Sequence, residues 1–294
     1  METIFTEFEA YLFQEKKMSR NSLEAYRRDI RAFGHFLSEK SIDNVLAVTE
    51  STVISYVLFL RKEGRTTATI NRKVASVRAF YNFLIKRGAI DDNPVKKIKT
   101  PKTEKKAPDY LSLEEVERLI EQPDDSPKGR RDRAILELMY ATGMRVSEVV
   151  NLDEGDINLK MGFAACVSED GKGRIIPIGT KCCESLAVYI DEVRADFLSD
   201  SKEKALFINQ SGGRLTRQGL WKIINIYAAE AGIEKRISPQ ILRNSFAAHM
   251  IQNGADLKSL QELLGHEDAA ATQIYLTLNK SRITDVYNKT HPRA

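Results

Sequence analysis

The chain has 294 residues, of which 42% are hydrophobic and 29% charged, a balance typical of a soluble protein with about two domains. No apolar run approaches the roughly 18 residues of a membrane span, and no basic, apolar and small-residue leader is present, so we expect a cytoplasmic protein. The cysteines, Cys166, Cys182 and Cys183, form no C-x-x-C pair, which argues against a disulfide framework and against a metal site.

The formal net charge of +4 hides an uneven distribution of charge along the chain. Residues 1–107 hold 21 Lys and Arg against 13 Asp and Glu, whereas residues 108–294 hold 24 against 28. A basic first part is typical of proteins that bind a phosphate polymer, but a solvated basic face without any ligand gives the same count. Charge alone therefore favours an anionic partner without establishing one.

Apolar residues recur at helical spacing through the first hundred residues. The pattern predicts four helices, near residues 2–16, 21–39, 50–63 and 67–87. Asn21, followed three residues later by Glu24, resembles the cap that starts the second of these helices. We therefore expect an N-terminal four-helix domain over residues 1–93.

Basic residues gather at the end of this domain. The fourth predicted helix carries Arg72, Lys73 and Arg78 beside its apolar stripe, which suits contact with phosphates and equally suits a solvated amphipathic helix. Residues 94–110 then hold three prolines and six lysines, which predicts an extended basic linker. The candidate phosphate-binding residues are the three on the helix and four on the linker: Lys96, Lys97, Lys99 and Lys102.

A second domain is predicted over residues 111–294. Ser112 and Glu115 form a capping box that starts a helix, and most of the following sequence has helical periodicity, including residues 180–197 and 215–231. The segments FAACV and RIIPI flank an Asp-Gly turn, which predicts a β-hairpin with Lys172 at its tip. The expected fold class is mainly α with one small β-hairpin.

Several polar residues of this domain are candidates for chemistry, and each has a structural alternative. Arg145 stands at a junction between two helices, where Glu148 one turn later either orients it or forms an ordinary surface ion pair with it. Gln240 and Arg243 share one helix face and can reach the same anion, although Arg243 in a structural helix can instead cap a neighbouring element. His266 and Tyr275, taken singly, fit ordinary surface and packing positions.

The order of these residues is more informative than any one of them. An arginine in ATGMRVSEVVNL, a lysine in GKGRIIPI, the arginine of LRNSFAAHM, the histidine of LLGH and a tyrosine nine residues later resemble the tyrosine recombinase family, and particularly its Xer branch. The segments SLEAYRRDIRAFGHFL and INRKVASVRAFYNFLIKRG resemble the DNA-clamping, SAM-like N-terminal domain of that branch. The resemblance covers nearly the whole chain.

This resemblance implies a site-specific DNA recombinase that forms a 3′-phosphotyrosine intermediate without a cofactor, a metal ion or ATP. Tyr275 would be the nucleophile, and Arg145 and Arg243 would neutralise the phosphate. Lys172 would protonate the leaving oxygen, and His266 would donate a hydrogen bond to the phosphate. The implied partner is a double-stranded DNA recombination site, bound by a tetramer of this chain alone or with another recombinase, with or without an activating protein.

One position departs from the family pattern, because Gln240 stands where most relatives have a histidine that assists deprotonation of the tyrosine. Glutamine cannot accept a proton, so cleavage is expected to be slower by up to roughly 10²–10⁴-fold. Three hypotheses stay open: a recombinase that resolves chromosome or plasmid dimers, a mobile-element integrase, and a DNA-binding architectural or regulatory protein that cleaves little. The C-terminal tail is expected to dock on a neighbouring protomer or to fold on its own domain.

Overall fold

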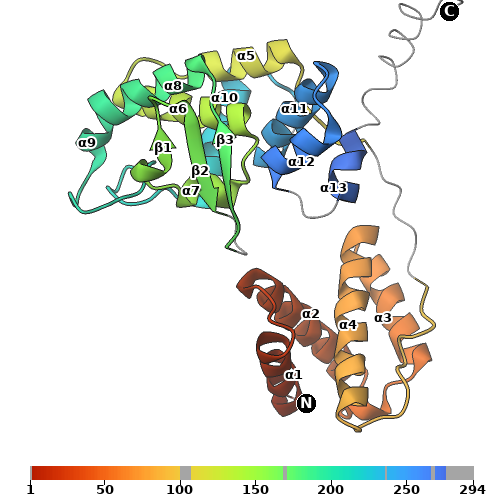
Figure 1. The fold of residues 1–294 in the computed structure, drawn as a ribbon. Helices are drawn as coiled ribbons and strands as arrows, with labels where there is room; N and C mark the ends of the chain where they lie inside the picture. Colours follow the sequence, from red (N-terminus) through yellow and green to blue (C-terminus); the bar gives the residue numbers. More distant parts are fainter. Residues whose placement is uncertain (1, 100–106, 168–170, 236, 266–268, 276–294) are drawn as a thin grey trace, which may run out of the picture. The chain divides into compact units, whose positions relative to one another are not determined.

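The computed structural model describes residues 2–99, 107–167, 171–235, 237–265 and 269–275. The chain divides into two compact units, Met1–Glu104 and Lys105–Ala294 (Figure 1). Both units are mainly helical and the second contains a small antiparallel sheet, so the predicted fold class is confirmed. Among the described residues, no helix is both long enough and apolar enough to cross a membrane.

Helices build the described part of the first unit: α1 (Glu2–Gln14), α2 (Arg20–Glu39), the 3-10 turn η1 (Val45–Ala47), α3 (Glu50–Lys62) and α4 (Thr67–Lys86). The four α-helices match the predicted ones, with ends that differ by at most about two residues. The predicted cap of α2 was wrong. Ser19 has an extended backbone and its hydroxyl accepts a hydrogen bond from the Ser22 N–H, which places Asn21 inside the helix.

Aromatic side chains form the centre of the first unit. Phe8, Phe33 and Phe80 have at most 1% exposure, and the Phe33 and Tyr56 rings lie 5.0 Å apart in an edge-to-face arrangement. Burial of each such side chain stabilises the unit by roughly 1.5–3 kcal/mol. Val95, which lies in the segment predicted as a linker, is also buried in this core.

A charged group lies among these apolar side chains. Asp29 on α2 is fully buried and accepts hydrogen bonds from Arg72 Nη1 at 2.5 Å, Lys73 Nζ at 3.2 Å and Ser76 Oγ at 2.9 Å. The two cations compensate the carboxylate for its loss of hydration. Asp29 therefore fixes the position of α4 against α2.

The described elements of the second unit are α5 (Leu113–Glu121), α6 (Pro127–Thr142), α7 (Val146–Asn151), the 3-10 turn η2 (Glu154–Asp156), β1 (Ile157–Asn158), β2 (Phe163–Val167), β3 (Gly173–Pro177), α8 (Thr180–Ala187), the π-helical turn η3 (Val188–Val193), α9 (Arg194–Phe197), α10 (Arg217–Glu230), α11 (Pro239–Gln252), α12 (Leu257–Leu264) and α13 (Ala269–Gln273). Helix α6 is central because it packs against α5, α8, η3 and α11. Its side chains are accordingly buried around much of its circumference.

The start of α5 confirms the predicted capping box. Ser112 Oγ accepts the Glu115 N–H, and the Glu115 carboxylate accepts the Ser112 N–H at 2.8 Å. The flanking Leu111 and Val116 are both fully buried, and the Leu111 N–H donates to Ser245 Oγ on α11. The first helix of the second unit is thereby attached to α11.

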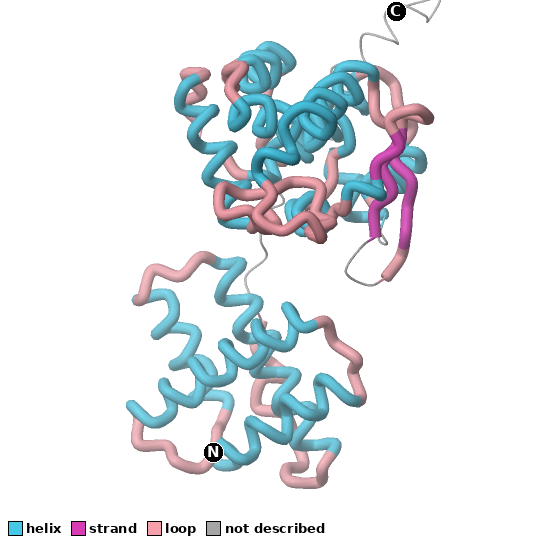
Figure 2. The backbone as a smooth tube through the Cα atoms, turned by 90° about the vertical axis from the view of Figure 1, so that its left-hand side faces the viewer, coloured by secondary structure: helices cyan, strands magenta, loops and turns pink. Residues whose placement is uncertain are grey.

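The predicted hairpin is also confirmed, with an additional short strand that the sequence analysis did not predict. The sheet order is β1, β2, β3, all antiparallel, and Ala164 pairs with Ile176. Figure 2 shows the strands in magenta beside the helices of the second unit. Ala164, Cys166 and Ile176 are buried against the helices, whereas Val167 and Ile175 are about two-thirds exposed. Alternation along the strands thus sets one inner and one outer face.

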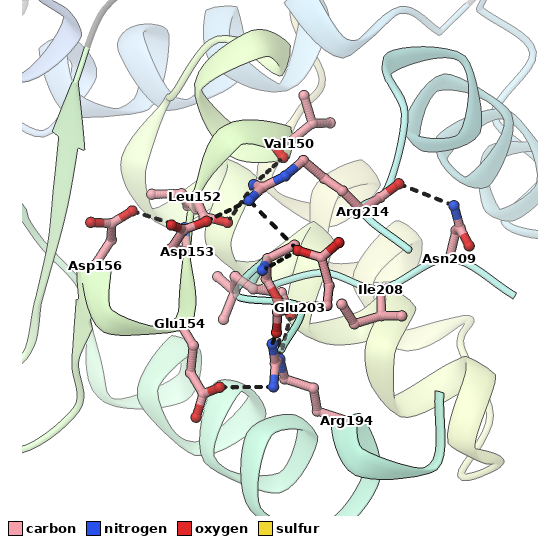
Figure 3. Close-up of polar contacts among 12 residues, drawn as sticks. Val150, Leu152, Asp153, Glu154, Asp156, Arg194, Glu203, Ile208, Asn209 and Arg214 are labelled. Carbon is pink, nitrogen blue, oxygen red and sulfur yellow. Dashed lines mark hydrogen bonds and ion pairs between the residues drawn. The ribbon is translucent and has the colours of Figure 1, made fainter. Parts of the chain in front are cut away.

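The connection between α9 and α10 is held by two arginines rather than by regular structure (Figure 3). Arg194 donates to the carbonyls of Glu203, Ala205 and Leu206, and Arg214 donates to those of Val150 and Leu152. These bonds add to the backbone hydrogen bonds of the isolated bridge between Asp153 and Ala205, in which the Leu206 N–H donates to the Leu152 carbonyl. They secure the connection against the end of α7.

Removal of the buried carboxylate tests the packing of the first unit. In Asp29→Ala the Lys73 side chain, which is only 11% exposed, loses its carboxylate partner, so we expect the free energy of unfolding to fall by about 3 kcal/mol. Urea denaturation followed by circular dichroism measures this. The control Asp92→Ala breaks an exposed 4.0 Å pair with Lys96 and should change the free energy by less than about 0.5 kcal/mol. Equal, small losses in the two variants would contradict the role of Asp29.

Candidate active site

Arg145 is placed by the sharp end of α6. Gly143 ends that helix with φ of 58°, and a Cβ atom there would lie 2.4 Å from Phe246 Cδ1, so the position favours glycine for both reasons. The chain then turns, and Arg145 becomes the residue before α7. Its N–H donates to Glu148 Oε2 at 2.7 Å and its Nη1 to Glu148 Oε1 at 3.1 Å, so the predicted contact with Glu148 is confirmed.

Arg243 lies on α11 and is only 2% exposed. Its Nη1 donates to the Gly143 carbonyl at 2.5 Å and its Nη2 to the Leu264 carbonyl at 2.7 Å. Burial and the nearby Arg145 lower the pKa of Arg243 to about 10, which still leaves the guanidinium protonated at neutral pH. Arg243 therefore links the ends of α6 and α12 and keeps its positive charge.

Three arginines meet at the C-terminal end of α12. Arg174 Nε donates to the Leu263 carbonyl at 2.8 Å, and Arg145 Nη2 donates to the Gly265 carbonyl at 3.2 Å. Together with the bond from Arg243 to Leu264, three consecutive carbonyls each accept one guanidinium. A helix C-terminus offers unpaired carbonyls and partial negative charge, both of which favour cations. We call Arg145, Arg174 and Arg243 the arginine cluster.

A buried carboxylate balances the arginine cluster. The Glu148 side chain is 2% exposed and accepts Arg174 Nη1 at 2.8 Å and Nη2 at 2.9 Å, in addition to its bonds from Arg145. Burial opposes ionisation, but the hydrogen bonds from Arg174 and from the Arg145 backbone prevail and lower the pKa of Glu148. Glu148 therefore stays charged and orients two of the three guanidinium groups.

Tyr275 is 3% exposed and packs against apolar side chains of α11 and α12. Its hydroxyl donates to Asn244 Oδ1 at 2.9 Å, and Gln240 Nε2 donates to the same oxygen at 3.1 Å. Burial raises the pKa of Tyr275, while Arg243 opposes the rise. Asn244, which sequence reasoning gave no role, is thus the side chain that contacts the Tyr275 hydroxyl.

The two remaining candidate residues of the second unit are Lys172 and His266, of which the structure describes only Lys172. Lys172 is exposed, follows Gly171 (φ 83°) and directly precedes β3, while His266 lies outside the described residues. Gly265, with φ of 62°, ends α12. Within the described ranges, no three His, Cys, Asp or Glu side chains are grouped closely enough to hold a metal ion.

The candidate phosphate-binding residues of the first unit fall into two groups. Arg72 and Lys73 are bonded to Asp29, and Arg78 Nη2 donates to the Ile98 carbonyl at 3.1 Å. The linker lysines Lys96, Lys97 and Lys99 are exposed, and Lys102 lies outside the described residues. The linker lysines are therefore more accessible to an anion than the helix residues are.

Comparison with known proteins agrees with this geometry. Residues 109–282 match the Phage integrase family, and residues 5–88 match the Phage integrase N-terminal SAM-like domain. Tyrosine recombinase XerD of Staphylococcus haemolyticus is 41% identical over the full length of both chains, and a putative tyrosine recombinase of Caldanaerobacter subterraneus is 42% identical over all of this chain and 99% of its own. The XerA recombinase structure has a TM-score of 0.56 at 28% identity, covering 99% of this chain and all of its own. A XerH complex with palindromic difH scores 0.78 at 22% identity, covering 96% and 83%.

A helical SAM-like unit followed by an integrase unit with an arginine cluster defines a DNA strand-transfer enzyme. The chain belongs to the phage integrase family of tyrosine recombinases, and within it the chain is similar to XerD proteins at 40–41% identity over its full length. It is accordingly a site-specific recombinase that cuts and rejoins DNA by transesterification. The family predicted from the order of motifs is confirmed.

Substitution of the buried carboxylate tests how the arginine cluster is held. Glu148→Gln keeps the shape of the side chain but removes its charge, and we expect the free energy of unfolding to fall by about 3 kcal/mol at pH 7. Because the folded-state pKa of Glu148 lies below its ordinary 4.5, the stabilisation is complete above about pH 4.5 and is lost as pH falls through the folded-state value. The difference from wild type should therefore narrow in acid, as measured by urea denaturation at several pH values.

A matched control is Glu154→Gln, which alters an ion pair with Arg194 in which the carboxylate is 48% exposed. Its effect on the free energy of unfolding should stay below about 1 kcal/mol. A stability loss in Glu148→Gln that does not change with pH would contradict the charge-based explanation.

Proposed function

We propose that this recombinase uses Tyr275 to attack the scissile phosphate and Arg145 and Arg243 to hold that phosphate. The carrying observation is that both guanidinium groups lie on neighbouring carbonyls, Leu264 and Gly265, while the Tyr275 hydroxyl binds the residue next to Arg243. Arg145 is 40% exposed, which supports access to a DNA phosphate, whereas Arg243 is only 2% exposed. Two cations near one phosphate stabilise the charge that develops on its non-bridging oxygens.

In the proposed reaction the phenol oxygen forms a bond to phosphorus and the bond from phosphorus to the 5′ oxygen breaks. The phenol loses its proton to water, and the 5′ oxygen gains one from Lys172, because an unprotonated alkoxide is a poor leaving group. A 5′ hydroxyl of the partner strand then attacks the phosphotyrosine and reverses these changes. His266 would donate a hydrogen bond to the phosphate during both steps.

We assign DNA binding to the basic residues of the first unit. Lys96, Lys97 and Lys99 are exposed, which supports contact with phosphates, and Lys102 belongs to the same basic stretch of sequence. Arg72, Lys73 and Arg78 would add charge from α4, of which Arg72, at 45% exposure, is more available than Lys73. Phosphate contacts of this kind supply sequence-independent affinity.

The biological role we favour is resolution of chromosome or plasmid dimers, because similarity to XerD proteins extends over the whole chain. A related fold occurs in a lambda integrase tetramer bound to a Holliday junction, and we propose that this chain also acts as a tetramer on its DNA site. A second recombinase and an activating protein remain part of the hypothesis, as does integration of a mobile element.

Trapping of the covalent intermediate tests the proposed chemistry. The DNA site is first found by nuclease protection, and a duplex with that site is then nicked near the cleavage position so that religation is prevented. Wild type should form a protein–DNA adduct that survives denaturation, and Tyr275→Phe, which lacks the nucleophilic oxygen, should form none while binding the same DNA. Binding without any adduct from wild type would favour the architectural or regulatory alternative.

The glutamine that departs from the family pattern gives a second prediction. Gln240 is bonded to Asn244 rather than to the Tyr275 hydroxyl, and an amide accepts no proton. We expect Gln240→His to raise the single-turnover cleavage rate by roughly 10- to 100-fold with unchanged DNA affinity, since an imidazole can accept the phenol proton. Asn225→His, which adds an imidazole to the exposed face of α10, should leave the rate unchanged. An unaltered or lower rate in Gln240→His would mean that glutamine already suffices.

A further inference from the structure

Arg174 has more connections than the residue roles described above require. It lies on β3, two residues after Lys172, and its side chain is 12% exposed. Its guanidinium uses Nε for the Leu263 carbonyl and both terminal nitrogens for Glu148. One planar group thus joins β3 to α12 and to the segment that presents Arg145.

The surroundings of Arg174 fix its guanidinium in place. A Cβ atom at Gly265 would lie 2.8 Å from Arg174 Nη1 and 3.1 Å from its Cζ, so glycine at this position leaves room for the group. The bidentate bond to Glu148 further restricts rotation, because both donors and both acceptors are engaged in one plane. A lysine at position 174 could supply the positive charge but could not form this bidentate pair of hydrogen bonds.

The consequence concerns the backbone that carries Lys172. Two residues of extended chain span at most roughly 7 Å, so an anchor at Arg174 limits how far the Lys172 backbone can move from the arginine cluster. Proton transfer requires hydrogen-bond reach, and misplacement by about 1 Å costs roughly 10²-fold in rate. The long lysine side chain can then search only a small region.

We propose that Arg174 is a positioning residue that holds the Lys172 strand within reach of the leaving 5′ oxygen. The proposal rests on the function assigned to Lys172 above. The competing explanation is that Arg174 acts through Glu148, which orients Arg145. In that case Arg174 would affect the phosphate clamp, by which we mean Arg145 and Arg243. The two explanations differ in which chemical step suffers when Arg174 is changed.

A substrate with sulfur in place of the bridging 5′ oxygen separates the two steps. In both substrates the phenol oxygen bonds to phosphorus, and either the P–O or the P–S bond breaks. An alkyl thiol has a pKa near 8.5, so a thiolate leaves without protonation, whereas an alkoxide requires an acid. The sulfur substrate therefore does not need Lys172, but it still needs the phosphate clamp.

The experiment measures single-turnover formation of the covalent adduct on nicked duplexes with oxygen or sulfur at this position. For Arg174→Ala and Arg174→Lys we expect cleavage to be slowed roughly 100-fold with oxygen and to lie within about threefold of wild type with sulfur. Lys172→Ala should show the same selective rescue. Arg145→Lys, which alters the clamp, should be slow on both substrates.

Arg194→Lys is the matched control, because it also replaces a buried guanidinium that donates to backbone carbonyls. Arg194 lies outside the arginine cluster. The control variant should cleave both substrates at the wild-type rate. Thermal denaturation and DNA affinity show whether each variant is folded. If Arg174→Ala does not fold, the comparison of the two substrates is made with Arg174→Lys.

Equal slowing of the Arg174 variants on both substrates would overturn the positioning role and assign Arg174 to the clamp. Wild-type rates on both substrates would overturn it as well. Failure of wild type to form an adduct on either substrate would instead remove the proposed function, and the inference about Arg174 with it.

Discussion

The catalytic unit depends on the hydrogen bonds between three guanidinium groups and three successive carbonyls at the end of α12. The groups come from α11, from β3 and from the residue before α7, so one helix terminus fixes three segments that are distant in sequence. Like charges so close together repel, and this repulsion from Arg145 adds to the effect of burial in lowering the pKa of Arg243. The partial negative charge of the helix end and the carboxylate of Glu148 offset that repulsion. The end of α12 and Glu148 together hold three positive charges close to one another.

The parts of the structure that follow local rules could be predicted from the sequence. Apolar periodicity gave the helices of the first unit, a capping box marked the start of α5, and an Asp-Gly turn marked the hairpin. The contact between Arg145 and Glu148 followed from their spacing of three residues. In each case the interacting residues are near one another along the chain, so their pattern is visible without a fold.

The parts that depend on tertiary contacts could not be predicted. Arg174 reaches Glu148 across 26 residues and Tyr275 reaches Asn244 across 31, and no spacing rule connects such pairs. Hydrogen bonds from side chains to backbone carbonyls, such as those of Arg194 and Arg214, cannot be predicted from the sequence either, because every residue has a carbonyl that could be the acceptor. Net charge also overstated the available cations of α4, since Asp29 takes up part of the charge of Arg72 and Lys73.

The burial of Val95 and Leu111 defines the tether between the two units. Each residue is fully buried in the core of its own unit, and the 15 residues from 96 to 110 lie between them. Fully stretched, such a segment spans at most roughly 50 Å. That upper limit bounds the distance between the two buried anchor residues, Val95 and Leu111. A deletion of several residues would shorten the reach in proportion without touching either core.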